Sequence, residues 1–496
     1  MTDIKIKDKY GLFINGEWSD ASDGGTIDTF CPFTGEKLAS IAQGTKEDVD
    51  RAVSSAWDAW DDWKKTTPRQ RAEYLNKIAD IIDENKEYLA KLETLENGKS
   101  ITETMNIDIP EAADHFRYFA SAIRVEEGSA TFIEDDLLSI IVREPIGVVG
   151  QIVPWNFPFL MAAWKLAPVL ATGCCTVFNP SSSTSLSVLA LAELIQDVLP
   201  KGVFNVVTGS GSKTGQAILD HPDISKLAFT GSTEVGRKVG LAAAEKLIPS
   251  TLELGGKSAH IFFPDLNEEK ALESIQMGIV YNQGQVCSAG SRLFIHEDIY
   301  DEFLPKVVDL FENVVVGDPL DPKSEMGTLI SEKQLNKVKN YIDIGVKEGA
   351  KIATGGNRIT DNNLDKGFFL QPTLLVDVTN DMTVAQEEIF GPVAVVIKFK
   401  DEQEVIDMAN DSDYGLGGGV WTQDINRAFR VAKSIQTGRM WVNTYNQLPA
   451  GAPFGGYKDS GIGRETHKSV MNHYSQVKNI MINTSDNPLG FYTGRK

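Results

Sequence analysis

Cysteine and histidine are scarce in this chain, which has four cysteines and six histidines among 496 residues. The scattered Cys31, Cys174, Cys175 and Cys287 are too few for a disulfide framework, so without an export signal we expect reduced thiols in a cytoplasmic protein. Cys174 and Cys175 end an apolar run, where cysteine behaves as a small hydrophobe, and we expect both in the core. Neither HExxH nor a paired-cysteine zinc spacing occurs, so the sequence predicts no metal site.

The chain also lacks an excess of positive charge and a long hydrophobic run. Lys and Arg total 48 against 69 Asp and Glu, and this net charge of −21 argues against sequence-independent nucleic-acid binding. The most apolar stretch, "FPFLMAAWKLAPVLA", contains Lys165 and Pro168 and is too short to span a bilayer. We therefore expect neither nucleic acid nor a membrane as partner. The length predicts two or three domains.

Two regions alternate short apolar runs with helical patterns. Residues 46–96 have apolar residues at helical spacing and are predicted to be helices. From 140 to 265 the predicted buried strands are "IIVREPIGVVGQIV", "TVFNP", "VFNVVTG", "KLAFTG", "STLEL" and "SAHIFF", with helical segments between them. This alternation predicts a parallel, doubly wound sheet with helices on both faces. A similar pattern from about 270 to 445 predicts a second α/β domain.

The tail "HYSQVKNIMINTS" alternates apolar and polar residues as a strand does. No hairpin partner lies near it in the sequence. A terminal edge strand needs a partner, which another subunit could supply.

The stretch "YNQGQVCSAGSR" sets Cys287 among small, polar and flexible residues with no apolar wall beside it. Such a cysteine is either a free thiol in a turn or a nucleophile that small molecules can reach. A cysteine peptidase is a rival explanation, but it needs a histidine to deprotonate the thiol, and nothing in the sequence places one near Cys287.

Two glycine-containing loops follow predicted strands and open helices. "VVTGSGSKTG" contains Gly209, Gly211 and Gly215, and "AFTGSTEVG" contains Gly231 and Gly236. Glycine lets backbone N–H groups approach a pyrophosphate, and a helix N-terminus adds favourable partial charge. Neither loop is the GxGxxG fingerprint, and a strand-to-helix turn needs small residues anyway, so a structural role stays open.

A glutamate and an asparagine complete the set of candidates. "TLELGGKS" places Glu253 at the end of an apolar strand, where a carboxylate is costly unless it is hydrogen-bonded or acts as an acid or base. In "IVPWNFPF", Asn156 lies between two prolines and could donate to a developing oxyanion. A capping or ion-paired glutamate and an ordinary turn asparagine are the structural alternatives.

Six motifs in order resemble those of the aldehyde dehydrogenase superfamily: "PWNFP", "FTGSTEVG", "LELGGKS", "NQGQVCSAGSR", "EEIFGPV" and "PFGGYKDSGIGRE". The resemblance extends from "LFINGEW" to the tail. It implies an α/β fold with a Rossmann-like cofactor domain (1–124 and 144–254), an α/β catalytic domain (255–465) and a small β oligomerisation element (125–143 and 466–496). It also implies a homodimer or homotetramer.

The resemblance implies covalent catalysis by Cys287, whose thiolate attacks the aldehyde carbonyl to give a thiohemiacetal. The Asn156 amide and the Cys287 backbone N–H would hold its oxyanion. Collapse to a thioester delivers hydride to the cofactor, and Glu253 then activates water to release the acid. Lys165 matches a lysine near the active site that assists the base.

The resemblance further implies the cofactor NAD, with NADP as the alternative. It assigns cofactor contacts to Trp155, Asn179, Ser182, Gly211, Gly231, Ser232, Thr233, Glu234, Val235, Gly236, Leu254, Glu388 and Phe390. The chain departs from the family in "NPSS": Asn179 replaces a lysine that bonds the adenosine ribose, and Ser182 replaces a glutamate that disfavours a 2′-phosphate. Since these changes oppose each other, we favour NAD.

Within the superfamily, "DIPEAADHFRYFA", "IPSTLELGGKS" and "SGIGRETHKSVMNHYSQVKN" resemble bacterial acetaldehyde dehydrogenases, which act on short aliphatic aldehydes. Phe157 and Trp164 match positions that line the substrate tunnel, which suits an uncharged aldehyde. Glu111 would lie near the tunnel mouth and disfavour an anionic semialdehyde. A semialdehyde or CoA-acylating enzyme and a catalytically idle scaffold remain alternatives, although Glu253 favours water as acyl acceptor.

Overall fold

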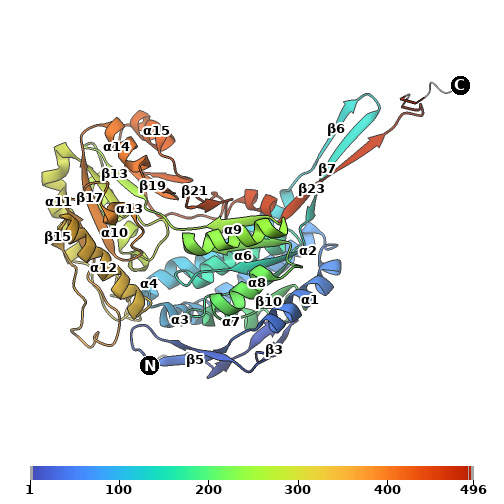
Figure 1. The fold of residues 1–496 in the computed structure, drawn as a ribbon, viewed down its shortest axis with the longest axis horizontal. Coiled ribbons are helices and arrows are strands. Elements are labelled where there is room, and N and C mark those ends of the chain that lie inside the picture. The colour runs from blue at the N-terminus through green and yellow to red at the C-terminus, as the bar shows by residue number, and fades with distance from the viewer. Residues whose placement is uncertain (1–3, 490, 493–496) are drawn as a thin grey trace.

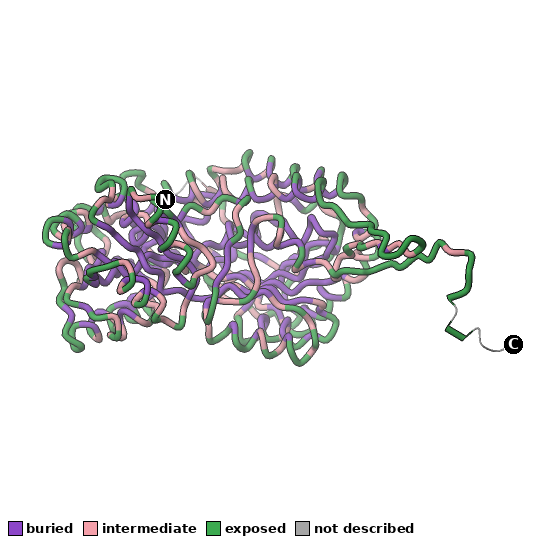
Figure 2. The backbone as a smooth tube through the Cα atoms, turned by 90° about the horizontal axis from the view of Figure 1, so that it is seen from above, coloured by how far each residue is buried: buried purple, intermediate pink, exposed green. Residues whose placement is uncertain are grey.

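Two β-sheets form two lobes, and a β-arm projects from one of them (Figure 1). The structure is a computed structural model and describes residues 4–489 and 491–492. Most buried residues lie in the two lobes, whereas the arm is largely exposed (Figure 2).

The first lobe is built on an eight-stranded sheet of order β22-β12-β11-β8-β9-β10-β2-β3. Strands β12, β11, β8, β9 and β10 are parallel, and both edges of the sheet are antiparallel. This confirms the parallel sheet predicted from the alternation, except that "SAHIFF", predicted as one of its strands, belongs to the sheet of the second lobe. The bounds are β2 Leu12–Ile14, β3 Glu17–Ser19, β8 Val148–Ile152, β9 Cys175–Asn179, β10 Phe204–Val206, β11 Lys226–Thr230, β12 Ser250–Glu253 and β22 Gly461–Ile462.

Helices of the first lobe begin and end at recognisable signals. Capping boxes at Thr45 and Thr67 start the first two, and Gly98, at φ 89°, ends the third, which confirms the helices predicted for 46–96. The first helix packs on β8, β9 and β10. The bounds are α1 Lys46–Trp63, α2 Pro68–Glu84, α3 Lys86–Asn97, α4 Ile101–Glu103, α5 Ile109–Ala122, α6 Pro158–Ala171, α7 Leu186–Leu194, α8 Gln216–Asp220 and α9 Thr233–Lys246.

The second lobe contains a seven-stranded sheet of order β15-β16-β17-β14-β13-β19-β20, parallel except for β15, as the second α/β pattern predicts. Its strands are β13 Ala259–Phe262, β14 Arg292–His296, β15 Lys351–Thr354, β16 Thr373–Val376, β17 Val393–Phe399, β19 Gly417–Trp421 and β20 Arg439–Val442. Its helices are α10 Glu268–Ile279, α11 Glu297–Glu312, α12 Glu332–Glu348, α13 Thr383–Gln386, α14 Glu402–Asn410 and α15 Ile425–Ser434.

The arm is an antiparallel sheet of β6 (Ser129–Glu134), β7 (Leu137–Pro145) and β23 (Ser475–Asn483), in the order β23-β7-β6. The tail is therefore a strand, as predicted. Its partner β7 belongs to the same chain, whereas the sequence suggested that another subunit could supply it. The two strands are distant in the sequence, so no turn signal could link them.

The predicted buried strand "IIVREPIGVVGQIV" is in fact two strands. Its first half lies in the half-exposed β7 and its second half is the buried β8. Gly147, at φ 123°, separates them, and a Cβ there would lie 2.7 Å from the Trp57 ring. The break therefore requires glycine.

Smaller elements complete the fold. A three-stranded sheet contains β1 Lys9–Tyr10, β4 Thr26–Phe30 and β5 Lys37–Ala42, and a two-stranded one pairs β18 Tyr414–Gly415 with β21 Tyr457–Lys458. Cys174 and Cys175 are buried in the core, as predicted. Within the described residues, no helix is both long enough and apolar enough to cross a membrane.

Candidate active site

A cavity of about 220 Å³ lies between the two lobes. Three of its walls are the segments that follow β8, β11 and β12, which are adjacent parallel strands of the first sheet. The remaining walls come from the loop before β14 and from residues of the second lobe. Carboxyl ends of parallel strands are where α/β folds bind their ligands.

Cys287 lies in the cavity wall, partly buried. Burial, followed by the carboxylates of Glu388 and Glu253, raises the pKa of its thiol to about 12. The thiol is therefore protonated near neutral pH and needs a base or an added positive charge to become a nucleophile. A Cβ on Gly256 would lie 2.4 Å from the Cys287 backbone oxygen, so only glycine allows this close approach.

Asn156 lies between β8 and α6, buried in the cavity wall. Its Nδ2 donates to the backbone oxygen of Gln285, at 2.8 Å, in the loop that carries Cys287. The Asn156 backbone oxygen in turn accepts from Asn282 Nδ2 at 2.7 Å. An amide nitrogen carries two hydrogens, so Asn156 can make a second donation.

Glu253 ends β12 and is buried in the cavity wall. Neither carboxylate oxygen has a hydrogen-bond partner among the described residues. Burial and then Glu465 raise its pKa well above 4.5, although Lys165 and Arg464 act in the opposite direction. The carboxyl group therefore neither caps a helix nor forms an ion pair. Its raised pKa shifts it toward the protonated form, so that it can exchange a proton.

Lys165 lies on α6, behind the cavity wall, and does not itself line the cavity. Its buried ammonium pairs with Glu465. It affects Glu253 through its charge, which lowers the pKa of that carboxyl group.

The residues predicted to bind a cofactor fall into two groups. Trp155, Gly231, Ser232, Leu254, Glu388 and Phe390 line the cavity. Asn179, Ser182, Gly211, Thr233, Glu234, Val235 and Gly236 do not. Four of the second group form the first turn of α9, directly after Ser232, whose hydroxyl accepts from Val235 N.

Asn179 and Ser182 lie outside the cavity lining, at and after the end of β9. Asn179 is buried at the end of β9, and its Nδ2 donates to the backbone oxygen of Val207 at 2.8 Å. Ser182 is half-buried, and Gly211 is exposed at the start of a π-helical turn, Gly211–Gly215. The side-chain amide of Asn179 is thus already used within the protein.

Glu388 and Phe390 bring the second lobe to the cavity. Glu388 Oε1 accepts from Gly256 N at 3.0 Å. Phe390 has a left-handed backbone, at φ 61°, and its ring meets that of Trp155 edge to face at 5.4 Å. Gln334 Nε2 donates to the Phe390 backbone oxygen at 2.6 Å and so supports this strained turn.

Phe157 and Trp164, predicted to contact substrate, both line the cavity. The Trp164 ring meets that of Phe454 at 5.3 Å. Glu111, on α5, is half-buried and does not line the cavity. The cavity near these rings is largely apolar.

Several cavity residues were not predicted from the sequence, namely Gln334, Lys337, Leu448 and Phe454. Gln334 and Lys337 come from α12, and Leu448 comes from a loop, without a local motif that marks them. Phe454 also lies in a loop, but within the motif "PFGGYKDSGIGRE", in which the resemblance assigns it no role. Glu465 was also missed, although it ends the motif "PFGGYKDSGIGRE", and the structure buries it completely, close in the sequence to the exposed Ile462.

The cavity suits a nicotinamide cofactor. Thr230 Oγ1 lines it, is buried and has no hydrogen-bond partner among the described residues. The next two residues lead into the exposed N-terminus of α9, where a helix favours anionic groups. A ligand carrying hydroxyl and phosphate groups would satisfy these donors. In residues 4–489 and 491–492, no group of three or more His, Cys, Asp or Glu is placed to hold a metal.

Comparisons with known proteins identify the family to which the chain is similar. The model of the Aldehyde dehydrogenase family matches residues 18–480. An acetaldehyde dehydrogenase of Pseudomonas aeruginosa is 48% identical over 99% of this chain and 98% of its own. An aldehyde dehydrogenase of Bacillus cereus, solved as an NAD+ complex, is 43% identical with a TM-score of 0.95, covering 98% of this chain and 100% of the other. A betaine aldehyde dehydrogenase of Staphylococcus aureus, also in complex with NAD+, is 39% identical with a TM-score of 0.95, covering 97% of each chain. The chain therefore belongs to the aldehyde dehydrogenase family and is an NAD(P)-dependent enzyme that oxidises an aldehyde.

Proposed function

We propose that Cys287 is the nucleophile, that Asn156 and the Cys287 backbone N–H stabilise the oxyanion, and that Glu253 is the general base. One observation carries the proposal: Cys287, Asn156 and Glu253 line the same cavity, and the carboxylate of Glu253 is buried without a partner. A buried carboxyl group without a structural partner is suited to proton transfer.

The reaction on this chain begins when the Cys287 thiol gives its proton to water and the thiolate adds to the aldehyde carbonyl. The oxyanion of the thiohemiacetal accepts from the Asn156 amide and the Cys287 N–H. A bound oxidised nicotinamide would supply a hydride acceptor and a positive charge, and loss of hydride from this carbon leaves a thioester on Cys287. The resulting thioester is attacked by a water molecule that gives its proton to Glu253, and the acid leaves as Cys287 is restored.

We propose NAD as the preferred cofactor, held by Trp155, Gly231, Ser232, Leu254, Glu388 and Phe390. The first turn of α9, Thr233 to Gly236, together with Gly211, Asn179 and Ser182, would contact the adenosine half. The two related structures with NAD+ support this choice. Gly236 packs so closely that a Cβ would lie 2.3 Å from Leu254, so the helix start is held against the cavity wall.

We propose a short, uncharged aliphatic aldehyde such as acetaldehyde as the substrate. Phe157, Trp164, Leu448 and Phe454 give the cavity an apolar wall, and Lys337 is the cation among the described residues that line it. No arginine in this lining is available to pair with the carboxylate of a semialdehyde. The name of the Pseudomonas aeruginosa relative agrees with this class.

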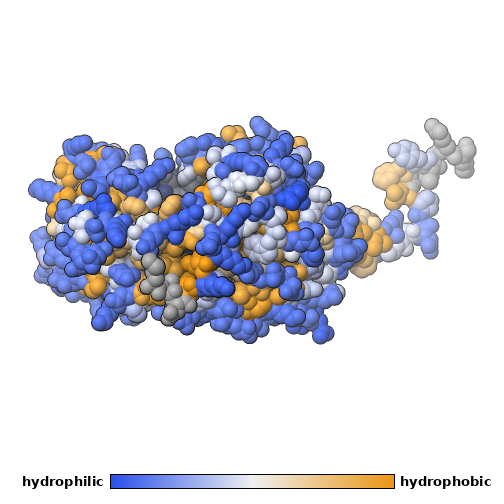
Figure 3. Space-filling view, turned by 90° about the horizontal axis from the view of Figure 1, so that it is seen from below, coloured by the Kyte–Doolittle hydropathy of each residue, from blue (hydrophilic) through white to orange (hydrophobic). Residues whose placement is uncertain are grey.

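We also propose that 125–143 and 466–496 assemble the chain into a homodimer or homotetramer, with 1–124 and 144–254 binding cofactor and 255–465 carrying the nucleophile. The arm exposes apolar side chains on a mainly hydrophilic surface (Figure 3). They are Phe132, Ile133, Ile141, Val477, Ile480, Met481 and Ile482. Such a surface favours contact with a second copy. Four free cysteines suit a reducing compartment such as the cytoplasm.

The test is the rate of NADH formation with acetaldehyde, longer aliphatic aldehydes, betaine aldehyde and succinate semialdehyde, each with NAD and with NADP. We expect the highest kcat/KM for a short aliphatic aldehyde with NAD. A preference for the semialdehyde, or a rate that requires coenzyme A, would contradict the proposed substrate or acyl acceptor. No turnover with any aldehyde would identify an idle scaffold.

A further inference from the structure

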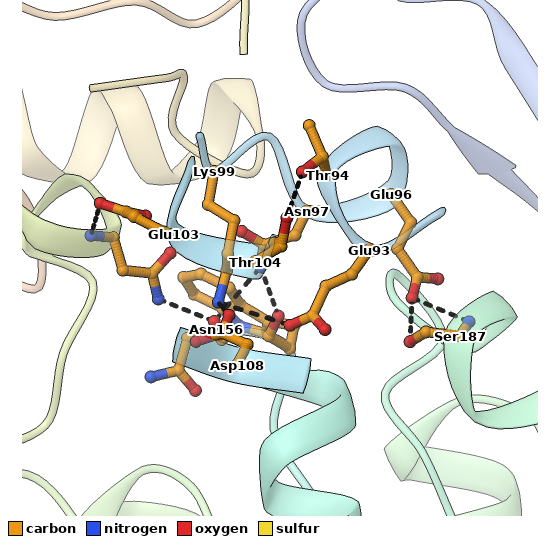
Figure 4. Close-up of polar contacts among 12 residues, drawn as sticks. Glu93, Thr94, Glu96, Asn97, Lys99, Glu103, Thr104, Asp108, Asn156 and Ser187 are labelled. Carbon is orange, nitrogen blue, oxygen red and sulfur yellow. Dashed lines mark hydrogen bonds and ion pairs between the residues drawn. The ribbon is translucent and has the colours of Figure 1, made fainter. Parts of the chain in front are cut away.

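Four buried ionisable residues lie directly behind the turn that carries Asn156 (Figure 4). We call Glu93, Lys99, Glu103 and Asp108 the Lys99 cluster. They come from α3, the residues after it, α4 and the π-helical turn Thr104–Asp108. All four are buried, and none lines the cavity that contains Cys287.

Lys99 and Asp108 form the central ion pair. Lys99 Nζ lies 2.6 Å from Asp108 Oδ2 and 3.5 Å from Glu93 Oε1. Burial raises the pKa of Glu93 well above its ordinary value and that of Glu103 to about 8, so Glu103 is mainly protonated near neutral pH. Because burying two charges costs free energy, a buried ion pair adds little net stability to the fold. What it contributes here is a fixed geometry of the two side chains.

One side of this cluster contacts the Asn156 turn. The Lys99 ammonium lies 4.1 Å from the centre of the Phe157 ring. Asn97, two residues before Lys99, donates from Nδ2 to the backbone oxygens of Trp155 at 2.8 Å and Asn156 at 3.4 Å. The turn is therefore held from behind on both sides of Asn156.

The other side contacts the loop that carries Cys287. Tyr281 donates from its hydroxyl to Asp108 Oδ1 at 3.1 Å, and Asn282 N donates to Glu103 Oε1 at 3.1 Å. Asn282 and Gln283 have left-handed backbones, at φ 47° and 56°, so this loop needs external support. The cluster thus joins the two segments that supply the proposed oxyanion donors.

We propose that Lys99 and Asp108 are positioning residues that fix the Asn156 amide relative to the Cys287 backbone N–H. The inference rests on the proposed roles of Asn156 and Cys287. Donors stabilise an oxyanion best when they are already in place and need no reorganisation during the reaction. The ion pair contacts one donor segment through the Phe157 ring and the other through the Tyr281 hydroxyl.

The first test uses Tyr281→Phe, which removes the hydroxyl on Asp108 but keeps the ring. We expect kcat to fall by about tenfold, since a misplacement of about 1 Å can cost about 100-fold. The KM for NAD should not change, because the cluster does not line the cofactor cavity. Lys99→Met should lower kcat further, and it leaves Asp108 as an unpaired buried charge.

A double-mutant cycle with Asn156→Ala separates positioning from general stability. Loss of an oxyanion donor alone should lower kcat by about 100- to 1000-fold. If Tyr281 and Lys99 act through Asn156, their substitutions should cost little more in the Asn156→Ala background.

Glu96→Gln is the matched control. Glu96 is buried on α3, close to Lys99, but it points away and accepts from Leu186 N and Ser187 N at the start of α7 (Figure 4). We expect a lower melting temperature with an unchanged kcat. A loss of kcat in Glu96→Gln equal to that in Tyr281→Phe would show that the effect is general and would contradict the inference.

The remaining outcomes are distinct. If Asn156→Ala keeps full kcat, the proposed oxyanion role is wrong. If it loses kcat but the Tyr281→Phe loss multiplies with it, or if Tyr281→Phe has no effect, the positioning role is wrong. Should Lys99→Met not fold, the Tyr281→Phe cycle decides alone.

Discussion

At the scale of single residues, Cys287 and Glu253 meet in a cavity that disfavours charge on both. Burial, followed by the carboxylates of Glu388 and Glu253, raises the pKa of the thiol, and burial also raises the pKa of both carboxyl groups. Such groups are poised to exchange protons rather than to hold permanent charges. The sequence could predict these residues because each lies within a short motif.

We expect the pH dependence of kcat to report Glu253. Its pKa lies well above 4.5, and only the ionised form accepts a proton from water. Activity should therefore fall as the pH falls, with a midpoint well above 4.5. The measurement is kcat against pH at saturating aldehyde and cofactor. An acid limb at 4.5 or below would contradict the buried, unpartnered state of this carboxyl group.

Glu253→Gln should impair thioester hydrolysis more than its formation. Glutamine resembles the protonated acid in shape and charge, so we expect the fold to be retained. Rapid mixing should show a burst of NADH of about one per active site, then turnover slower by about 10²- to 10⁴-fold. A steady-state rate equal to that of the wild type would assign Glu253 a structural role.

Asn179→Lys tests the departure from the family pattern. A new cation at the adenosine ribose could add a bond worth roughly 1.5–3 kcal/mol, which would lower the KM for NAD by up to about tenfold. NADP should gain at least as much, because Ser182 does not repel a 2′-phosphate. Asn179→Met, of similar length but uncharged, is the control. Unchanged KM values for both cofactors would show that position 179, whose amide binds Val207, does not face the ribose.

At the scale of elements, the arm combines strands that are far apart in the sequence. The tail was predicted as a strand from its alternation, but its pairing with β7 could not be predicted, because no turn connects the two. For the same reason, the sequence did not reveal that "IIVREPIGVVGQIV" divides between arm and sheet. Alternation indicates a strand, whereas partner and burial depend on tertiary structure.

Ile480→Asp in β23 should weaken subunit assembly. Ile480 is among the exposed apolar residues of the arm. A short carboxylate buried in an interface costs several kcal/mol of the free energy of association, and ~1.4 kcal/mol corresponds to a tenfold change in affinity. Sedimentation velocity should show smaller species than for the wild type. Val346→Asp, at an exposed site on α12, is the control. An unchanged sedimentation coefficient for Ile480→Asp would contradict the proposed role of the arm.

At the scale of the whole molecule, the two-lobed α/β architecture could be predicted from alternating strands and helices, and the family from six ordered motifs. The sequence could not predict which distant segments contact one another. Lys337 and Leu448 reach the cavity from the second lobe, and Lys99 lies behind Asn156, without a local pattern that marks any of them. Such contacts depend on the tertiary structure, within a lobe for Lys99 and between the lobes for Lys337 and Leu448.

The central claim is that this chain oxidises an aldehyde through a covalent bond to Cys287. The most direct measurement is the steady-state rate of NADH formation with acetaldehyde for the wild type, Cys287→Ser and the control Cys31→Ser, each at equal concentration of folded enzyme. A hydroxyl is a far poorer nucleophile than a thiol near neutral pH, so Cys287→Ser should lose nearly all activity while Cys31→Ser keeps it. If Cys287→Ser kept more than about a tenth of the wild-type rate, equivalent to ~1.4 kcal/mol of barrier, Cys287 would not be the nucleophile.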